Sequence, residues 1–461
     1  MVCRALDAFS PLDVPDPISI PLWGSERRER QCSVTPMLKS GPSTGRGEYS
    51  RERQQQEPGT SQIRITKLKL SNFRNYAECS LELDPGITVF QGPNGHGKSN
   101  LMEAIYMIAI AKSPRSSSDR ELLGWDVVQN GGHVQIAGVA RDHELTVQSQ
   151  IDFDVIPRSP EPGSGGARPT PSIKKELRVN GVPRLASEFV GAVNVVAFSA
   201  EDLDLIMGGP SVRRRYLDIL ISQSEASYLK MIQRYGRVVT QRNHLLRQMR
   251  EGRVGPDELE FWDDRLLNEG AAIIERRTRA VERLAEEAAP RHLALSGGRE
   301  QLGVQYRPRI SAIAEDGPDE IPSSTPDLIS AMREALVAAR PREIGQGQTV
   351  IGPHRDEIAL SLNDEPAGAF SSRGQARTIA LALRLAEGAF VTAATGRTPV
   401  LALDDVLSEL DEKRRRLVLE NVASYEQVLI TTTDFDRVED SFLTGATRMT
   451  VESGQVTRVT D

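Results

Sequence analysis

Apolar and polar residues alternate in the first part of the chain that shows a regular pattern. In "IRITKLKLSNF", Ile63, Ile65 and Leu68 recur between polar residues, which predicts a half-buried strand that begins at Ile63. The stretch "CSLELDPGITVFQG" predicts two further strands that meet at Pro85 and Gly86. After a glycine-rich loop, the apolar run "LMEAIYMIAIA" predicts a helix.

The middle of the chain changes to a helical period. From about Ser211 to Pro290 apolar residues recur on one face, as Leu217, Leu220 and Ile221 do. Strand and helix patterns then alternate again in segments such as "TPVLALDDV" and "EQVLITTTD". We therefore predict an α/β fold, a nucleotide-binding head whose two halves are separated by a helical insertion.

The predicted domain boundaries follow these changes of pattern. The two halves of the head and the insertion between them are assigned to residues 62–205, 341–461 and 206–340, respectively. Residues 1–61 are rich in Pro, Ser, Arg, Glu and Gln and have no sustained apolar period, so we expect a disordered extension. Pro-rich surface loops are expected at 156–173 and 315–326.

Composition narrows the class of protein. The 461 residues are 39% hydrophobic and 26% charged, as in soluble globular proteins, and two domains are the natural expectation. No apolar run is long enough to span a bilayer, so no membrane association is expected. Three scattered cysteines, Cys3, Cys32 and Cys79, suit neither a disulfide framework nor a zinc site, which favours the cytoplasm. A net charge of -7 does not favour nucleic acid, but local basic patches decide such binding.

The loop between the strand "GITVFQ" and the apolar helix carries the pattern G-x-x-x-x-G-K-[ST]. We expect its glycines to let backbone N–H groups surround the phosphates of a nucleotide. Lys98 is predicted to reach the β- and γ-phosphates, and the Ser99 hydroxyl to ligate Mg²⁺. His96 is expected to face solvent. The residues assigned to nucleotide binding here are Gly92, Pro93, Asn94, Gly95, His96, Gly97, Lys98, Ser99 and Asn100.

A second acidic element supports the same site. Val400, Leu401 and Leu403 predict a buried parallel strand that ends in Asp404 and Asp405. Ligands of open α/β sheets bind at this end of the strands. We therefore expect Asp404 to hold the Mg²⁺ shell and Asp405 to orient or deprotonate an attacking water, with Lys98 assisting the chemistry.

A third element suggests how the site is completed. In "FSSRGQARTIALALRLAE", Ser372, Gly374 and Gln375 resemble the signature motif of the ABC-type ATPases, and "SELD", which ends at Asp411, resembles their D-loop. The resemblance implies an ABC-type ATPase head, a mixed sheet with flanking helices, and an ATP bound between two subunits. The predicted nucleotide-binding residues therefore include these four as well.

Further motifs make the resemblance more specific. The stretches "LSNFRNY", "FSAEDLDLIMGGPSVRRRYLD" and "IGPHRDE" are similar to those of the RecF family of bacterial recombination mediators, from about Ile63 onward. The resemblance implies an ATP-dependent homodimer with weak DNA-stimulated ATPase activity. It also implies binding to single- and double-stranded DNA at gaps, with RecR and RecO as partners and RecA loaded indirectly. Recombinational repair, replication restart and SOS induction are the implied processes.

Two features depart from the ABC pattern. The glutamine that links Mg²⁺ to the inserted domain is not identifiable, and Gln129, Gln135 and Gln148 all remain candidates. Where transporters carry a switch histidine, "ITTTDFD" offers Thr433 and Asp434. This difference, together with the absence of a compact head, disfavours a transporter subunit. It also leads to the hypothesis of slow hydrolysis.

Arginines of the helical segment are candidates for DNA contacts. Arginines spaced along helices can bind phosphates without reading bases. From Arg213 to Arg253 we favour DNA or the dimer interface, whereas for 265–290, where acids alternate, we favour a solvated face. Arg74 and Arg355 are placed near the nucleotide or, nearly as well, in structural roles. The candidates in the first group are Arg213, Arg214, Arg215, Arg234, Arg237, Arg242, Arg247, Arg250 and Arg253.

Overall fold

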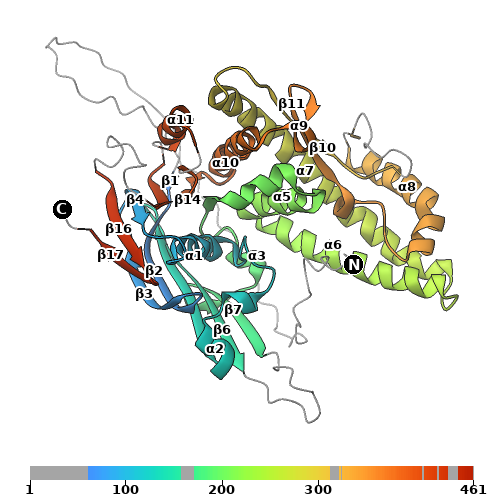
Figure 1. The fold of residues 1–461 in the computed structure, drawn as a ribbon. Helices are drawn as coiled ribbons and strands as arrows, with labels where there is room; N and C mark the ends of the chain where they lie inside the picture. Colours follow the sequence, from blue (N-terminus) through green and yellow to red (C-terminus); the bar gives the residue numbers. More distant parts are fainter. Residues whose placement is uncertain are drawn as a thin grey trace, which may run out of the picture. The chain divides into compact units, whose positions relative to one another are not determined.

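The computed structural model describes residues 61–156, 171–311, 321–322, 324–407, 410–422, 425–433 and 445–459 (Figure 1). By its internal contacts the chain divides into two units, Met1–Pro58 and Gly59–Asp461, and the described residues belong to the second. The expected disordered extension, apart from Ser61, lies outside the described residues. So do most of the loops predicted at 156–173 and 315–326.

A mainly parallel sheet forms the centre of the head. Its strands run in the order β17-β16-β4-β15-β14-β9, and all neighbours except β17 and β16 are parallel. The central strands are apolar over most of their length because both faces are covered. The strands are β4 (Gly86–Gln91), β9 (Val195–Phe198), β14 (Val400–Asp404), β15 (Gln427–Thr432), β16 (Thr447–Glu452) and β17 (Gln455–Arg458).

A second, antiparallel sheet lies beside the first, in the order β3-β2-β5-β6-β7-β8. The alternation that predicts a strand from Ile63 is confirmed, since Ile65, Leu68 and Leu70 are buried in β2. The strands are β2 (Arg64–Phe73), β3 (Tyr76–Glu82), β5 (Gly132–Arg141), β6 (Thr146–Ile156), β7 (Ser172–Val179) and β8 (Val182–Pro183). Short β1 (Ser61–Gln62) pairs with β13 (Arg397–Thr398).

Helix α1 (Lys98–Ile110) lies between the two sheets (Figure 1). It contacts β9 and β14 of the parallel sheet and β5 and β6 of the antiparallel one. Every residue from Leu101 to Ile110 is buried, which explains why "LMEAIYMIAI" is apolar around the whole helix rather than on one face. The phosphate loop is thereby anchored to a rigid, three-layered body.

Long helices form the middle of the chain. Helices α6 (Ala226–Arg250), α7 (Glu260–Leu295) and α8 (Thr325–Gln346) pack against one another, and we call these three the arm (Figure 1). Helix α5 (Pro210–Ser224) links the arm to the head. One strand, β10 (Leu302–Arg307), also falls within the predicted insertion and pairs with β11 (Glu357–Leu362).

Helix α10 (Arg373–Thr395) packs against α7, α4 (Leu203–Met207) and α5. By length and composition it is the one helix among the described residues that would suffice to cross a membrane. However, 67% of its most apolar window is buried inside the protein, as in a core helix. The remaining helices near it are α9 (Ala367–Phe370) and α11 (Glu412–Val422), and α2 (Trp125–Asn130) and α3 (Ala186–Phe189) lie in the antiparallel half.

Candidate nucleotide-binding site

The predicted phosphate loop connects the end of β4 to the start of α1. Gly95 and Gly97 have φ values of 82° and 118°, a left-handed conformation that side chains disfavour. At Gly92 a Cβ atom would lie 2.1 Å from the backbone oxygen of Val451 in β16. Glycine is therefore required at three positions of the loop, twice for conformation and once for space.

The motif "NFRNY" holds the loop from outside. The Asn75 Nδ2 donates to the His96 carbonyl at 3.1 Å, and the Tyr76 hydroxyl donates to the Gly97 carbonyl at 2.9 Å. The backbone N–H of Gly454 also donates to His96 O, at 3.0 Å. His96 is only half exposed, because its Nδ1 accepts from the N–H of Ser453. His96 therefore faces solvent only in part.

Lys98 lies inside the loop. Its Nζ donates to the carbonyl oxygens of Gly92 and Pro93, at 2.7 and 3.1 Å, and the residue is only 6% exposed. Burial lowers the pKa of this ammonium, whereas the charges of Asp405 and Asp404 raise it. The lysine is therefore a positive charge held at the centre of the loop, next to two carboxylates.

The acidic strand meets the loop at its serine. Ser99 Oγ donates to Asp404 Oδ1 at 3.1 Å, although 305 positions separate the two residues. Thr431, at the end of β15, donates to the same oxygen at 2.8 Å and accepts from the N–H of Asp405 at 2.9 Å. Burial raises the pKa of Asp404, and these hydrogen bonds lower it. Thr431 is not among the site residues predicted from the sequence, although it lies in the segment "EQVLITTTD" that contributes to the predicted α/β pattern.

This arrangement fits Mg²⁺ bound together with a nucleoside triphosphate. Ser99 and Asp404 present a hydroxyl and a carboxylate side by side, the oxygen ligands that Mg²⁺ uses beside phosphates. A cation next to Asp404 would offset the cost of burying its charge. The loop glycines and Lys98 fit the phosphates, since they leave room for close approach and provide positive charge.

A pocket opens next to the two aspartates. It is lined by Asp404, Asp405 and Val406, by Arg377 and Leu381 of α10, and by residues of the segment Phe198–Leu203.

The three glutamines that are candidates for linking the metal to the insertion do not line this pocket. Gln135 binds Asp152 in the antiparallel sheet, Gln148 pairs with Asn180 there, and Gln129 belongs to α2. The segment that reaches the acidic strand is instead "FSAED", which the resemblance had already singled out.

The signature residues form the start of α10. Ser372 is the N-cap: its Oγ accepts from the N–H of Gln375, whose side chain accepts from the Ser372 N–H at 2.8 Å. Gln375 Nε2 also donates to Glu300 at 2.9 Å. Ser372 is exposed and Gly374 half-exposed. Asp411, assigned to the D-loop, is exposed and caps α11 by accepting from the Arg414 N–H at 2.9 Å.

Several arginines proposed for DNA or nucleotide contacts have partners within the chain. Arg213 makes a bidentate ion pair with Glu357, and Arg214 donates to the Asp356 carbonyl at 2.7 Å. Arg242 is fully buried between Asp263 and Glu343. Other arginines of this kind also have partners: Arg215 donates to Ser113 O, Arg234 pairs with Glu269, Arg74 with Glu103, and Arg355 donates to Gln348.

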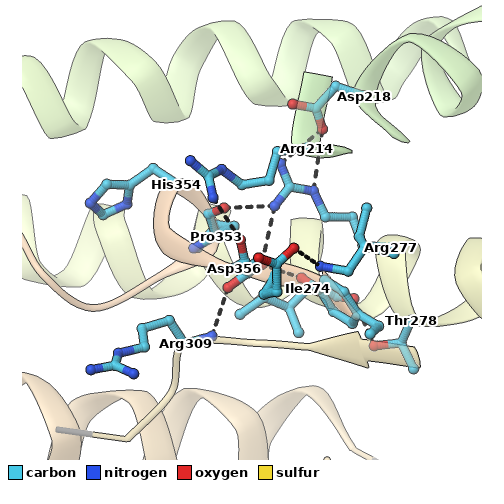
Figure 2. Close-up of polar contacts among 12 residues, drawn as sticks. Arg214, Asp218, Ile274, Arg277, Thr278, Arg309, Pro353, His354 and Asp356 are labelled. Atoms are coloured by element: carbon cyan, nitrogen blue, oxygen red, sulfur yellow. Dashed lines mark hydrogen bonds and ion pairs between the residues drawn. The ribbon is translucent and has the colours of Figure 1, made fainter. Parts of the chain in front are cut away.

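The motif "IGPHRDE" lies where α7 meets α5 and the β10–β11 pair, a region that we call the base of the arm (Figure 2). Arg277 of α7 donates to Asp356 Oδ2 at 3.1 Å, to the Pro353 carbonyl at 2.6 Å and to Asp218 of α5 at 2.8 Å. Figure 2 shows its guanidinium between these acceptors. Asp356 also accepts from the N–H of Arg309 at 2.7 Å. The motif therefore ties α5, α7 and the β10–β11 region together.

Comparison with known proteins agrees with the geometry. A family model described as RecF/RecN/SMC N terminal domain matches residues 64–457. Proteins named DNA replication and repair protein RecF from Roseiflexus castenholzii and Herpetosiphon aurantiacus are 38% and 37% identical to this chain over 399 and 396 residues. Each alignment spans 85% of this chain and 99% of the relative.

Two solved structures are also similar. Structures of the recombination mediator protein RecF of the RecFOR pathway, described as RecF-ATP and RecF-ATPrS, have TM-scores of 0.75 and 0.73. Both are 28% identical to this chain and cover 88% and 87% of it and all of themselves. The predicted fold class, an ATPase head of mixed α/β structure with a helical insertion, is confirmed.

Proposed function

This chain belongs to the RecF family, and on that premise we propose that it is an ATP-switched DNA-binding protein of replication and repair. The observation that carries the proposal is the hydrogen bond between Ser99 of the phosphate loop and Asp404 of the acidic strand. It joins the phosphate loop to the acidic strand across 305 positions of sequence. Relatives with the RecF name and solved structures described with ATP support the same reading.

Each part of the site has a proposed role. The residues from Gly92 to Asn100 bind the phosphates, and Ser99 and Asp404 hold Mg²⁺. Bound Mg²⁺ would neutralise charge on the phosphate oxygens. Asp405, positioned through its N–H by Thr431, orients the attacking water, and Lys98 stabilises charge on the phosphates. We infer weak, DNA-stimulated hydrolysis that resets a switch.

The exposed signature loop supports a proposal of dimerisation. Ser372 and Gly374 stand at the N-terminus of a 23-residue helix, where backbone N–H groups and the helix dipole favour an anion. We propose that they bind the γ-phosphate held by a second copy of the chain, with Asp411 near the same interface. The dimer would bind single- and double-stranded DNA at gaps in the cytoplasm. RecR and RecO would be its partners, with RecA loading, replication restart and SOS induction as consequences.

Two variants test ATP binding and dimerisation separately. Lys98→Ala should abolish ATP binding and ATP-dependent dimerisation, measured by fluorescent-nucleotide titration and light scattering. Ser372→Arg should leave ATP binding by the monomer intact and abolish only dimerisation. If either variant still dimerised with ATP as the unaltered chain does, the proposal of a site shared by two subunits would be wrong.

Turnover provides a separate test of the switch. Asp405→Asn should slow ATP hydrolysis measured with gapped DNA, while ATP binding persists. A fast ATPase that ignores DNA would contradict the proposal. Binding to gapped, single-stranded and duplex DNA with ATP, with ADP and without nucleotide then establishes which DNA structure responds to the switch.

A further inference from the structure

Glu300 lies between the end of α7 and the start of β10, beside the signature loop. Its Oε1 accepts a hydrogen bond from Gln375 Nε2 at 2.9 Å, and its Oε2 lies 3.3 Å from His292 Nε2. His292 belongs to the last turn of α7 and is fully buried, and the Glu300 side chain is 19% exposed. One carboxylate therefore contacts both the longest helix of the arm and the first turn of the signature helix.

The backbone around Glu300 is held on both sides. Its own N–H donates to the Oγ of Ser296, the C-cap of α7, at 3.3 Å. The N–H of Gln301 donates to Asn363 Oδ1 at 2.8 Å, and the N–H of Asn363 donates to the Gln301 carbonyl at 2.9 Å. Because the carboxylate is presented from a fixed backbone, little conformational freedom is lost when it bonds to Gln375.

Glu300 determines which way the side-chain amide of Gln375 faces. An ionised carboxylate only accepts hydrogen bonds, so the Gln375 Nε2 turns toward it, and the Gln375 Oε1 accepts from the Ser372 N–H at 2.8 Å. The Gln375 N–H in turn donates to Ser372 Oγ at 3.3 Å. A hydroxyl oxygen that accepts this bond can still donate its own hydrogen, so the exposed Ser372 can bind an anion beyond the helix.

We propose that Glu300 is a positioning residue for the ATP site that two subunits share. It holds Gln375, and through Gln375 it holds the Ser372 hydroxyl in the orientation that binds the γ-phosphate of a second copy of the chain. The inference rests on the proposed function, in which Ser372 and Gly374 complete the site of the other subunit. Glu300 acts through Gln375, from which 75 positions separate it, and it belongs to none of the motifs found in the sequence.

The bond between Glu300 and Gln375 is strong enough for this role. It is charge-assisted, and such bonds are stronger than those between two neutral groups. The low exposure of the Glu300 side chain also limits screening by water and salt. Without Glu300, the long side chain of Gln375 regains rotamers in which its oxygen no longer caps the Ser372 N–H.

Dimerisation of the full chain as a function of protein concentration, with ATP and Mg²⁺, tests this role. Glu300→Ala should raise the concentration at which half of the chains are dimeric by about tenfold, as expected for one lost charge-assisted hydrogen bond. ATP binding by the monomer, measured with fluorescent nucleotide at lower protein concentration, should stay nearly unchanged. Glu300→Gln keeps an oxygen that can accept from Gln375, so its dimerisation should resemble that of the unaltered chain.

An exchange of the two side chains tests the hydrogen bond itself. Gln375→Glu places two carboxylates against each other, so dimerisation should weaken at least as much as in Glu300→Ala. Adding Glu300→Gln places an amide donor opposite the new carboxylate, so the double variant should dimerise better than Gln375→Glu alone. In the Gln375→Ala background, Glu300→Ala should have no further effect on dimerisation.

A matched control separates this inference from the function on which it rests. Glu287→Ala removes a carboxylate of α7 that pairs with Arg291, and it should leave dimerisation unchanged. The inference alone is overturned if Glu300→Ala dimerises normally, if it weakens ATP binding by the monomer as well, or if the exchange recovers nothing. If the unaltered chain does not dimerise with ATP, the proposed function is overturned too.

Discussion

Arg277 brings a positive charge into the interior of the protein, where it is 2% exposed. Asp218, Asp356 and the Pro353 carbonyl surround it (Figure 2). A charge buried in this way is tolerated only when its hydrogen-bonding capacity is filled, because water can no longer solvate it. At the residue scale, the buried arginine at the base of the arm therefore stabilises the fold. The predicted nucleotide site is built from other residues, such as Lys98 and Asp404.

The loss of Arg277 should be costly. Arg277→Ala leaves Asp356, itself 0% exposed, without its buried cationic partner, so the unfolding free energy should fall by about 3–5 kcal/mol. Urea denaturation followed by circular dichroism measures the change. Arg279→Ala, two residues along the same helix but 66% exposed, should cost at most about 0.5 kcal/mol. Similar losses in both variants would contradict the role of the buried network.

His354 gives stability a dependence on pH. Burial, together with the charges of Arg355, Arg214 and Arg242, lowers the pKa of His354 from 6.5 to about 3, although the hydrogen bond to the Thr349 carbonyl opposes this shift. Between these values the unfolded chain binds a proton that the folded chain does not bind. The unfolding free energy should therefore fall as pH falls below 6.5, by up to about 1.4 kcal/mol per pH unit.

A variant isolates the contribution of this histidine. His354→Gln removes the titrating group, so its loss of unfolding free energy between pH 7 and pH 5 should be about 2 kcal/mol smaller than that of the unaltered chain. Urea denaturation at the two pH values gives the comparison. His244→Gln, at an exposed position of α6, should retain the full loss. An unchanged loss in His354→Gln would show that other groups cause it.

At the scale of elements, the phosphate loop is held by its neighbours rather than by its own sequence alone. Strand β16 passes so close to Gly92 that no side chain fits, and the turn at Ser453 and Gly454 binds His96. Asn75 and Tyr76 close the loop from the other side. The loop therefore keeps its shape because strands from both ends of the head enclose it.

Two glycine substitutions compare this enclosure with an open position. Gly92→Ala places a Cβ 2.1 Å from Val451 O, so the backbone must shift, and we expect a loss of about 1–3 kcal/mol in unfolding free energy. Gly236→Ala, on an exposed face of α6 with free space, should instead stabilise by about 0.5–1 kcal/mol. Thermal and urea denaturation measure both the expected loss and the expected gain in unfolding free energy. A stabilised Gly92→Ala would contradict the described loop.

The periodicity of the sequence predicts elements better than it predicts their partners. Alternation and turn residues indicate β2, β4 and α1, and the motif spacing indicates the phosphate loop, because these signals are local. The pairing of β10 with β11, which joins Leu302 to Leu362 across 60 positions, leaves no such signal. The ion pair of Arg213 with Glu357, 144 positions away, leaves no local signal either.

At the scale of the whole molecule, a net charge of -7 does not exclude a local positive surface. Once the structural arginines are set aside, Arg237, Arg247 and Arg250 remain exposed on α6. Phosphate contacts release counterions, so DNA affinity falls steeply with salt even for an acidic protein. The arm is therefore the part of the chain that we expect to meet DNA.

Salt dependence tests this assignment. Replacing Arg237, Arg247 and Arg250 together with glutamine should weaken DNA binding and reduce the slope of log affinity against log salt by about 2–3. Fluorescence anisotropy with gapped DNA at several salt concentrations measures the slope. The same three charges removed from ion-paired positions, Arg279, Arg291 and Arg416, should alter it far less. Equal slopes in both triple variants would place the DNA elsewhere.

The order of strands in the parallel sheet also has a consequence during synthesis. Strand β4 ends at Gln91, yet its neighbours β15 and β16 begin only at Gln427 and Thr447. A ribosome adding roughly 5–20 residues per second needs about 20–70 s to cover that interval. Throughout it, the apolar helix α1 has emerged without the sheet that covers one side of it. The nascent head is therefore a natural client for chaperones until the last strands arrive.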